Sequence, residues 1–136
     1  MKTRFACPAL FAVIVTVSPM LAHHRASRGF DKNKVTTLQG VITKVTWINP
    51  HVSMSMEVKN ASGGVTTWKV EMAAPNSLFR DGMRPESFEL NKSCSIEIWP
   101  AFDGSPQANG RKLIFPDGRS FDIHDKWTDI ADKPAK

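Results

Sequence analysis

Apolar and polar residues alternate through the middle of the chain, a pattern typical of strands with one buried face. The alternation is clearest over residues 51–58, where every second residue is apolar and would face inward: Val52, Met54, Met56 and Val58. Over residues 38–48 the alternation puts these residues on one face: Val41, Thr43, Val45 and Trp47. The same pattern predicts further strands over residues 65–72, 93–99, 112–115 and 119–123.

Interruptions of the alternation predict how the strands are connected. Residues 60–64 predict a hairpin loop, and Pro116-Asp117-Gly118 predicts a tight turn. Residues 73–82 combine a cap residue, helix-compatible residues and a glycine stop, which predicts one short helix. A single turn is expected at residues 85–88.

The predicted order is three strands, one short helix, and then two or three further strands. This is the element order of an OB-fold, a small Greek-key barrel. We therefore predict an all-β fold: a small antiparallel barrel, OB-fold-like, with five to six strands and one short helix between strands 3 and 4. A simple meander barrel or a small sandwich would give much the same pattern, and both remain open from the sequence.

The first 22 residues resemble an export signal. Lys2 and Arg4 form a positive start, an apolar run covers residues 9–17, and Ala22 is small enough to precede a signal-peptidase cut. The sequence therefore predicts a signal peptide over residues 1–22 and a periplasmic protein. The apolar run is shorter than the roughly 20 residues that span a bilayer, and we expect no transmembrane segment in the mature chain.

The remaining chain is expected to form one domain. We predict an N-terminal arm over residues 23–35, the β-barrel domain over residues 36–124 and a polar C-terminal tail over residues 125–136. Cleavage after Ala22 leaves 136 − 22 = 114 residues, a common domain size. The sequence does not indicate the oligomeric state.

Charge and cysteine content narrow the classes of function. Loss of Lys2 and Arg4 lowers the net charge of +5 to +3, and no block of basic residues is present. We therefore expect no nucleic acid partner. Cys94 is the single cysteine outside the signal, and its place in an alternating strand predicts a buried structural thiol.

Histidines provide the best candidate site. Cleavage after Ala22 would give His23 a free α-amine beside its imidazole, with His24 next to it. If paired positions in the hairpin around residues 60–63 sum to about 122, His51 lies opposite Glu71 on the outer face. Imidazole, amine and carboxylate groups suit copper(II), so His23, His24, His51 and Glu71 are the predicted metal ligands.

Simpler interpretations of these residues remain open. His51 and Glu71 can form an ordinary surface ion pair, and His23 and His24 can be solvated residues left by the signal. No nucleophile motif or glycine-rich phosphate loop is present, so we predict a protein that is not an enzyme.

Two other functions compete with metal binding. One is a ligand-binding module for an envelope glycan, since tryptophans on strands can stack on a ligand. Trp47 and Trp68 fall on the core-facing sides of their strands, whereas Trp99 is expected to be the most exposed tryptophan. The other is an interaction subunit of an envelope complex, which leaves no mark in the sequence.

Seven short segments along the chain carry a recognisable pattern: residues 22–24, 38–41, 47–51 (Trp-Ile-Asn-Pro-His), 68–71 (Trp-Lys-Val-Glu), 74–80 (Ala-Pro-Asn-Ser-Leu-Phe-Arg), 103–105 (Asp-Gly-Ser) and 116–119 (Pro-Asp-Gly-Arg). With these segments the chain resembles the exported bacterial proteins of domain-of-unknown-function family 6152. Two segments depart from the family pattern: Arg25-Ala26 replaces the usual Ser-Phe after the double histidine, and Asn91-Lys92-Ser93 replaces Pro-Gly-Asp. The resemblance implies export and a common small β fold, and it supplies no reaction.

Overall fold

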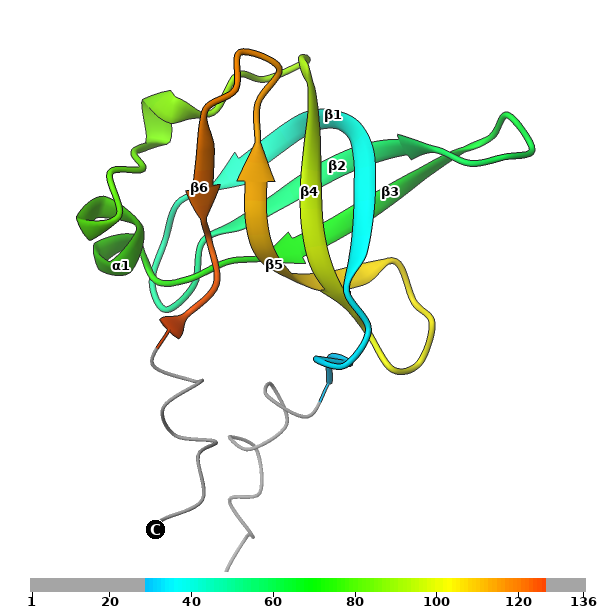
Figure 1. Ribbon diagram of the computed structural model, residues 1–136, viewed down its shortest axis with the longest axis horizontal. Helices are drawn as coiled ribbons and strands as arrows, with labels where there is room; N and C mark the ends of the chain where they lie inside the picture. Colours follow the sequence, from blue (N-terminus) through cyan, green and yellow to red (C-terminus); the bar gives the residue numbers. More distant parts are fainter. Residues whose placement is uncertain (1–28, 127–136) are drawn as a thin grey trace, which may run out of the picture.

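The alternating segments form one sheet in the computed structural model, which describes residues 29–126 (Figure 1). A short helix and one 3₁₀ turn (η2) separate the third strand from the fourth. The elements are β1 (Thr36–Thr46), β2 (Ser53–Lys59), β3 (Val65–Glu71), α1 (Pro75–Arg80), η2 (Pro85–Ser87), β4 (Ser93–Pro100), β5 (Gln107–Ile114) and β6 (Ser120–Asp122).

The first five strands close into a barrel. The sheet order is β3-β2-β1-β4-β5-β6, and an additional pairing of β3 with β5 joins the two sides. Every pairing is antiparallel except this one, which is parallel and covers Lys69–Glu71 against Gln107–Asn109. A meander barrel pairs all neighbours antiparallel, so the parallel closure excludes that alternative. The prediction of a small OB-fold-like β barrel with a helix after the third strand is confirmed, with one parallel pairing added.

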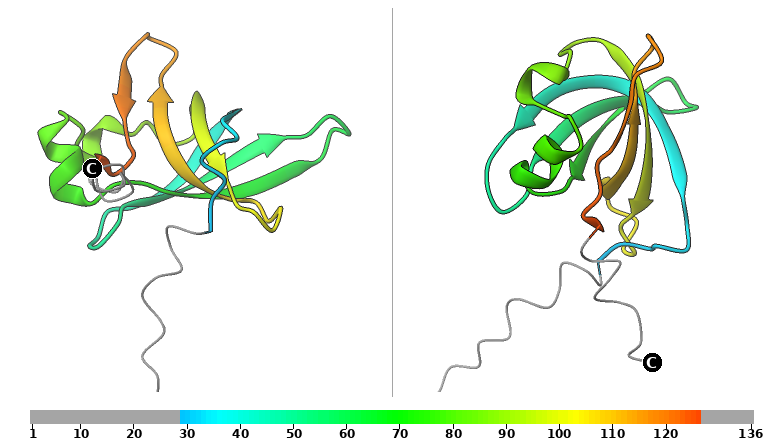
Figure 2. Two further views of the ribbon diagram at one scale, coloured as in Figure 1. Left: turned by 60° about the horizontal axis from the view of Figure 1, so that its bottom comes forward. Right: turned by 60° about the vertical axis from the view of Figure 1, so that its left-hand side comes forward.

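Strand β1 contributes to both sides of the barrel. Its first half pairs with β4 and its second half with β2, and Figure 2 shows the strong curvature that this requires. At Gly40 the strands cross so closely that a Cβ would collide with the carbonyl oxygen of Glu57. Glycine permits this approach because it has no side chain.

A bulge in β1 makes the predicted phase of that strand wrong in its first half. The register with β2 shifts between Ile42 and Lys44, so Thr43 is an extra residue. An extra residue reverses which side chains face inward. Ile42 is therefore fully buried, whereas Val41 is not, and after the bulge Val45 packs against the core as predicted.

The inward faces and α1 build a single apolar core. The predicted inward residues Val52, Met54 and Met56 are buried, and Trp47 and Trp68 pack against the core from its margin, as expected. No polar or charged residue is buried within residues 29–126. Leu78, from α1, and Met83, from the segment after it, are fully buried in this core. Figure 2 shows α1 lying at one end of the barrel.

Some element boundaries differ from the prediction. The helix covers Pro75–Arg80 rather than residues 73–82, and β5 begins at Gln107 rather than Lys112. The early part of β5 contains glutamine, asparagine and glycine, which are weak strand formers. It forms a strand because Ala108 and Asn109 pair with both β3 and β4. Within residues 29–126, no helix is both long and apolar enough to cross a membrane.

Candidate functional site

The closest contact between predicted site residues joins His51 and Glu71. His51 lies just before β2 and Glu71 ends β3, and Nδ1 of the imidazole is 2.9 Å from Oε1 of the carboxylate. The two side chains are 37% and 34% exposed, so solvent reaches both. The predicted contact between these two residues therefore exists.

The predicted hairpin register was wrong by two residues. The strands pair Ser53 with Glu71 and Met54 with Val70, so paired positions sum to 124 and not to 122. His51 is thus a diagonal neighbour of Glu71. A shift by an even number of residues keeps every side chain on its predicted face, because the period of a strand is two. The diagonal distance still lies within reach of two long side chains.

The contact fixes which imidazole nitrogen is available. An ionised carboxylate only accepts hydrogen bonds, so the proton of this bond lies on Nδ1 of His51. In the neutral imidazole, Nε2 then carries the free electron pair. A histidine that binds a metal through one nitrogen commonly donates its other N–H to a carboxylate, which orients the ring. The geometry of His51 and Glu71 is compatible with this arrangement.

The other two predicted ligands, His23 and His24, lie outside the described residues. Between residues 29 and 126, no three histidine, cysteine, aspartate or glutamate residues come together as a metal-holding group. The structure therefore brings two of the four predicted ligands together and does not address the other two.

Cys94 is the buried thiol that the sequence predicts. It is 5% exposed, and burial raises the pKa of its thiol to about 11. A metal ligand of the cysteine type must be a thiolate. The raised pKa therefore favours the protonated thiol near neutral pH, which fits a structural role.

Trp99 corrects an expectation about stacking. Its ring was expected to be exposed, but it is only 8% exposed. It does lie on the outer face, where the side chains of Lys32 and Arg111 cover the ring, with centroid distances of 5.7 and 5.2 Å. The ring of His124 contacts it edge-on at 5.7 Å. Trp99 is therefore not available as a stacking surface.

Three segments quoted for the family resemblance meet around His51. The His51–Glu71 contact joins residues 47–51 to residues 68–71. Trp47 contacts Phe79 edge-on at 5.4 Å, which joins residues 47–51 to residues 74–80 in α1. Next to this contact, Ile48 is 60% exposed. The β1–β2 loop is thus the point where these segments converge.

Sequence reasoning missed one feature, a groove beside the loop between β4 and β5. Phe102 in this loop is 65% exposed and lines the groove together with Trp68. The available signal was one aromatic residue inside an otherwise polar turn sequence, Asp103-Gly104-Ser105.

Comparison with known proteins yields a family and no described relative. A family model described as "Family of unknown function (DUF6152)" matches residues 12–110 of the chain. No curated protein matches. No solved structure matches either.

Proposed function

The chain belongs to the family of unknown function DUF6152, and we propose that it is an exported, non-enzymatic β barrel that binds copper. The observation that carries the proposal is the 2.9 Å contact between His51 and Glu71 on a solvent-accessible surface. In this proposal Nε2 of His51 is a ligand atom, and Glu71 orients the ring through Nδ1.

The remaining ligands would come from the N-terminal arm. A path across neighbouring strands leads from the start of the described chain to Glu71. Phe30 forms a β-bridge with Ala101, and the backbone N–H of Ala101 donates to the carbonyl of Gln107. Gln107 in turn pairs with Lys69, two residues before Glu71 on β3. Three strand spacings and two residues along β3 give a separation of about 16 Å between Phe30 and Glu71. His24 is six residues before Phe30, and that length of extended chain spans about 20 Å.

The placement of the elements supports this reach. In Figure 1 the β1–β2 loop and the beginning of the described chain both lie toward the lower end of the barrel. In this proposal, His23 and His24 reach the His51 ring without any change in the barrel.

Copper(II) is the metal that this donor set favours. The α-amine and imidazole of His23, the imidazole of His24 and Nε2 of His51 are all nitrogen donors. Copper(II) prefers such ligands in tetragonal geometry and has the highest affinity of the first-row divalent ions. Binding displaces protons from the amine and imidazoles, so uptake should weaken as the pH falls.

The test compares two forms of the mature protein, one beginning at His23 and one extended by a single residue. We expect the first to take up one Cu(II) with a nitrogen-rich tetragonal electron paramagnetic resonance spectrum. The extension converts the amine of His23 into an amide and should weaken binding strongly. Equal affinity in the two forms would show that the terminal amine is not a ligand.

Variants of the barrel test the second half of the site. His51→Ala should weaken binding further and alter the spectrum. Glu71→Ala should weaken it by about tenfold, the usual effect of removing a carboxylate that orients a ligand. Glu57→Ala, an exposed carboxylate on β2, is the matched control and should leave affinity unchanged. If His51→Ala and Glu57→Ala bind equally well, the barrel takes no part in the site.

A further inference from the structure

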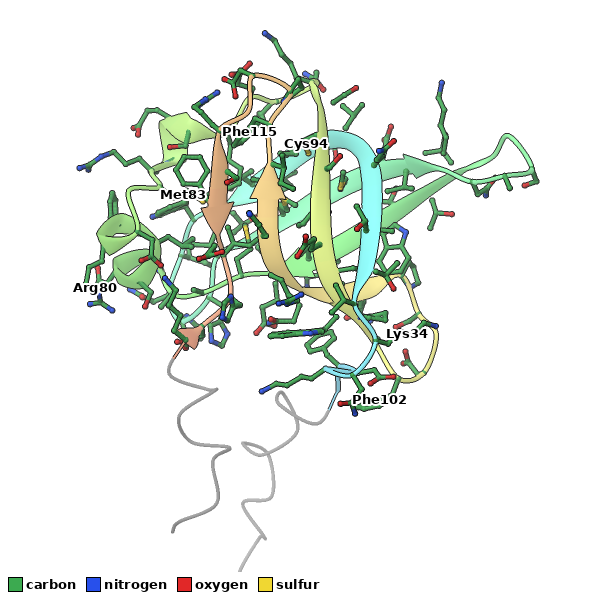
Figure 3. All side chains as sticks on the ribbon, viewed as in Figure 1. Lys34, Arg80, Met83, Cys94, Phe102 and Phe115 are labelled. Atoms are coloured by element: carbon green, nitrogen blue, oxygen red, sulfur yellow. The ribbon has the colours of Figure 1, made fainter. Side chains whose placement is uncertain are left out.

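A groove lies between the β4–β5 loop and the start of the described chain. Its volume is about 370 Å³, within the size range of small-ligand sites. Figure 3 shows Lys34 and Phe102 at this end of the barrel. The lining residues come from separate parts of the sequence: Asp31, Lys34, Thr36, Trp68, Pro100, Ala101, Phe102, Gly104 and Ser105.

Two aromatic rings line the groove. Trp68 is half-buried and packs against the core, so its ring is held by the barrel. Phe102 is the most exposed of the large apolar residues described, with 65% of its surface accessible. Exposure of a phenyl ring to water costs free energy, and a ligand that covers the ring would recover it as binding free energy.

The loop that carries Phe102 is fixed before any ligand binds. The carboxylate of Asp103 accepts hydrogen bonds from the backbone N–H and the hydroxyl of Ser105, at 2.9 and 2.6 Å. The backbone N–H of Phe102 donates to the carbonyl of Gly29 at 3.0 Å, and that of Ala101 donates to Gln107 at 2.9 Å. Binding of a ligand to Phe102 therefore carries only a small entropy cost for ordering the loop.

The polar part of the lining offers both donors and acceptors. Asp31 contributes a carboxylate, Lys34 an ammonium group and Thr36 a hydroxyl, and the Ser105 hydroxyl, which donates to Asp103, contributes an acceptor. One acidic and one basic residue leave the lining without net charge. A nucleic acid site needs an excess of positive charge to hold phosphates, and this groove lacks it.

We propose that the groove binds a short oligosaccharide. A pyranose ring has an apolar C–H face, which suits Trp68 and Phe102, and a rim of hydroxyls, which suits Asp31, Lys34, Thr36 and Ser105. A protein partner normally needs a surface of about 800 Å² per side, whereas this site is a small concave groove. The site is separate from the His51–Glu71 pair and does not depend on the proposed copper function.

The experiment is a titration of ¹⁵N-labelled protein with maltotriose, cellotriose and chitotriose, each in the presence of EDTA. We expect at least one trisaccharide to shift the indole resonance of Trp68, assigned with Trp68→Phe, and the backbone resonances of residues 101–105. Phe102→Ala should weaken this binding by about tenfold, because a stacking contact is lost. Phe79→Ala removes another exposed phenylalanine, on α1, and should leave binding unchanged.

Three results would overturn the proposal. The first is the absence of shifts with all three trisaccharides, and the second is binding that Phe102→Ala leaves intact. The third is a stronger shift of the same resonances by a single-stranded oligothymidylate, which would assign the groove to nucleic acid. Since EDTA keeps copper out of the assay, none of these outcomes affects the metal proposal.

Discussion

The β2–β3 hairpin and the β4–β5 pair both form part of the closed barrel, yet the sequence predicts the first much better than the second. In β2 of the hairpin, apolar and polar residues alternate without a break, and the inward face of the hairpin is the predicted one. In β5 the register shifts opposite Glu97 and Ile98, and the strand begins with polar residues and glycine. The difference shows that a strand paired on both edges can form with little local preference of its own.

The largest effect on stability should come from truncating a core side chain in each region. Met56 in the hairpin and Leu113 in β5 are both fully buried. Met56→Ala and Leu113→Ala should each lower the free energy of unfolding by about 2–5 kcal/mol, because each leaves a cavity. Chemical denaturation measures both. A cost in the hairpin several times that in β5 would mean that local pattern strength, and not burial, determines stability here.

A smaller effect should come from the hairpin loop. Gly63 has a φ of 85°, a conformation that a β-branched residue adopts only with strain. Gly63→Val should cost about 1–3 kcal/mol. Ser62→Val and Gly64→Val should cost less, since neither backbone has positive φ. Equal thermal midpoints for all three variants would contradict this turn geometry.

The smallest effect should come from the β4–β5 loop, where the residue that accepts from a serine two positions on is the carboxylate of Asp103, whereas its counterpart in the hairpin loop is the neutral amide of Asn60. Hydrogen bonds from Ser105 hold the pKa of Asp103 below its ordinary value of about 3.9. A lowered folded pKa stabilises the fold above the unfolded pKa, and this contribution is lost as the pH falls through the folded value. Asp103→Asn should therefore lower the thermal midpoint slightly at pH 6, and the difference should shrink as the pH falls through the folded pKa of Asp103. A midpoint difference that stays constant throughout the acid range would argue against this ionisation.

Much of the fold could be predicted from periodicity, and the errors have local physical causes. The His51–Glu71 contact was predicted from a wrong register because the error was even, and the correct face was kept. Thr43 could not be identified as a bulge residue, since nothing in a Val-Ile-Thr-Lys-Val segment indicates an extra residue.

The environment of Trp99 illustrates what periodicity cannot supply. The outward direction of the ring was predicted, but the side chains that shield it from solvent were not. Part of this cover is Lys32, which is far from Trp99 in the sequence, and part is Arg111, which the pairing of β5 with β4 brings next to the ring. The groove at Phe102 was missed for the same reason, because its walls come from segments that only the closed barrel brings together.

The parallel pairing that closes the barrel also has a consequence for how the chain folds. It joins Lys69 to Gln107, which are 107 − 69 = 38 positions apart, whereas the hairpins pair residues close in sequence. Contacts between distant residues require closure of a long loop, which slows their formation. We therefore expect the hairpins to form before this closure and before the pairing of β1 with β4, which joins Thr36 to Ile98 across a still longer segment.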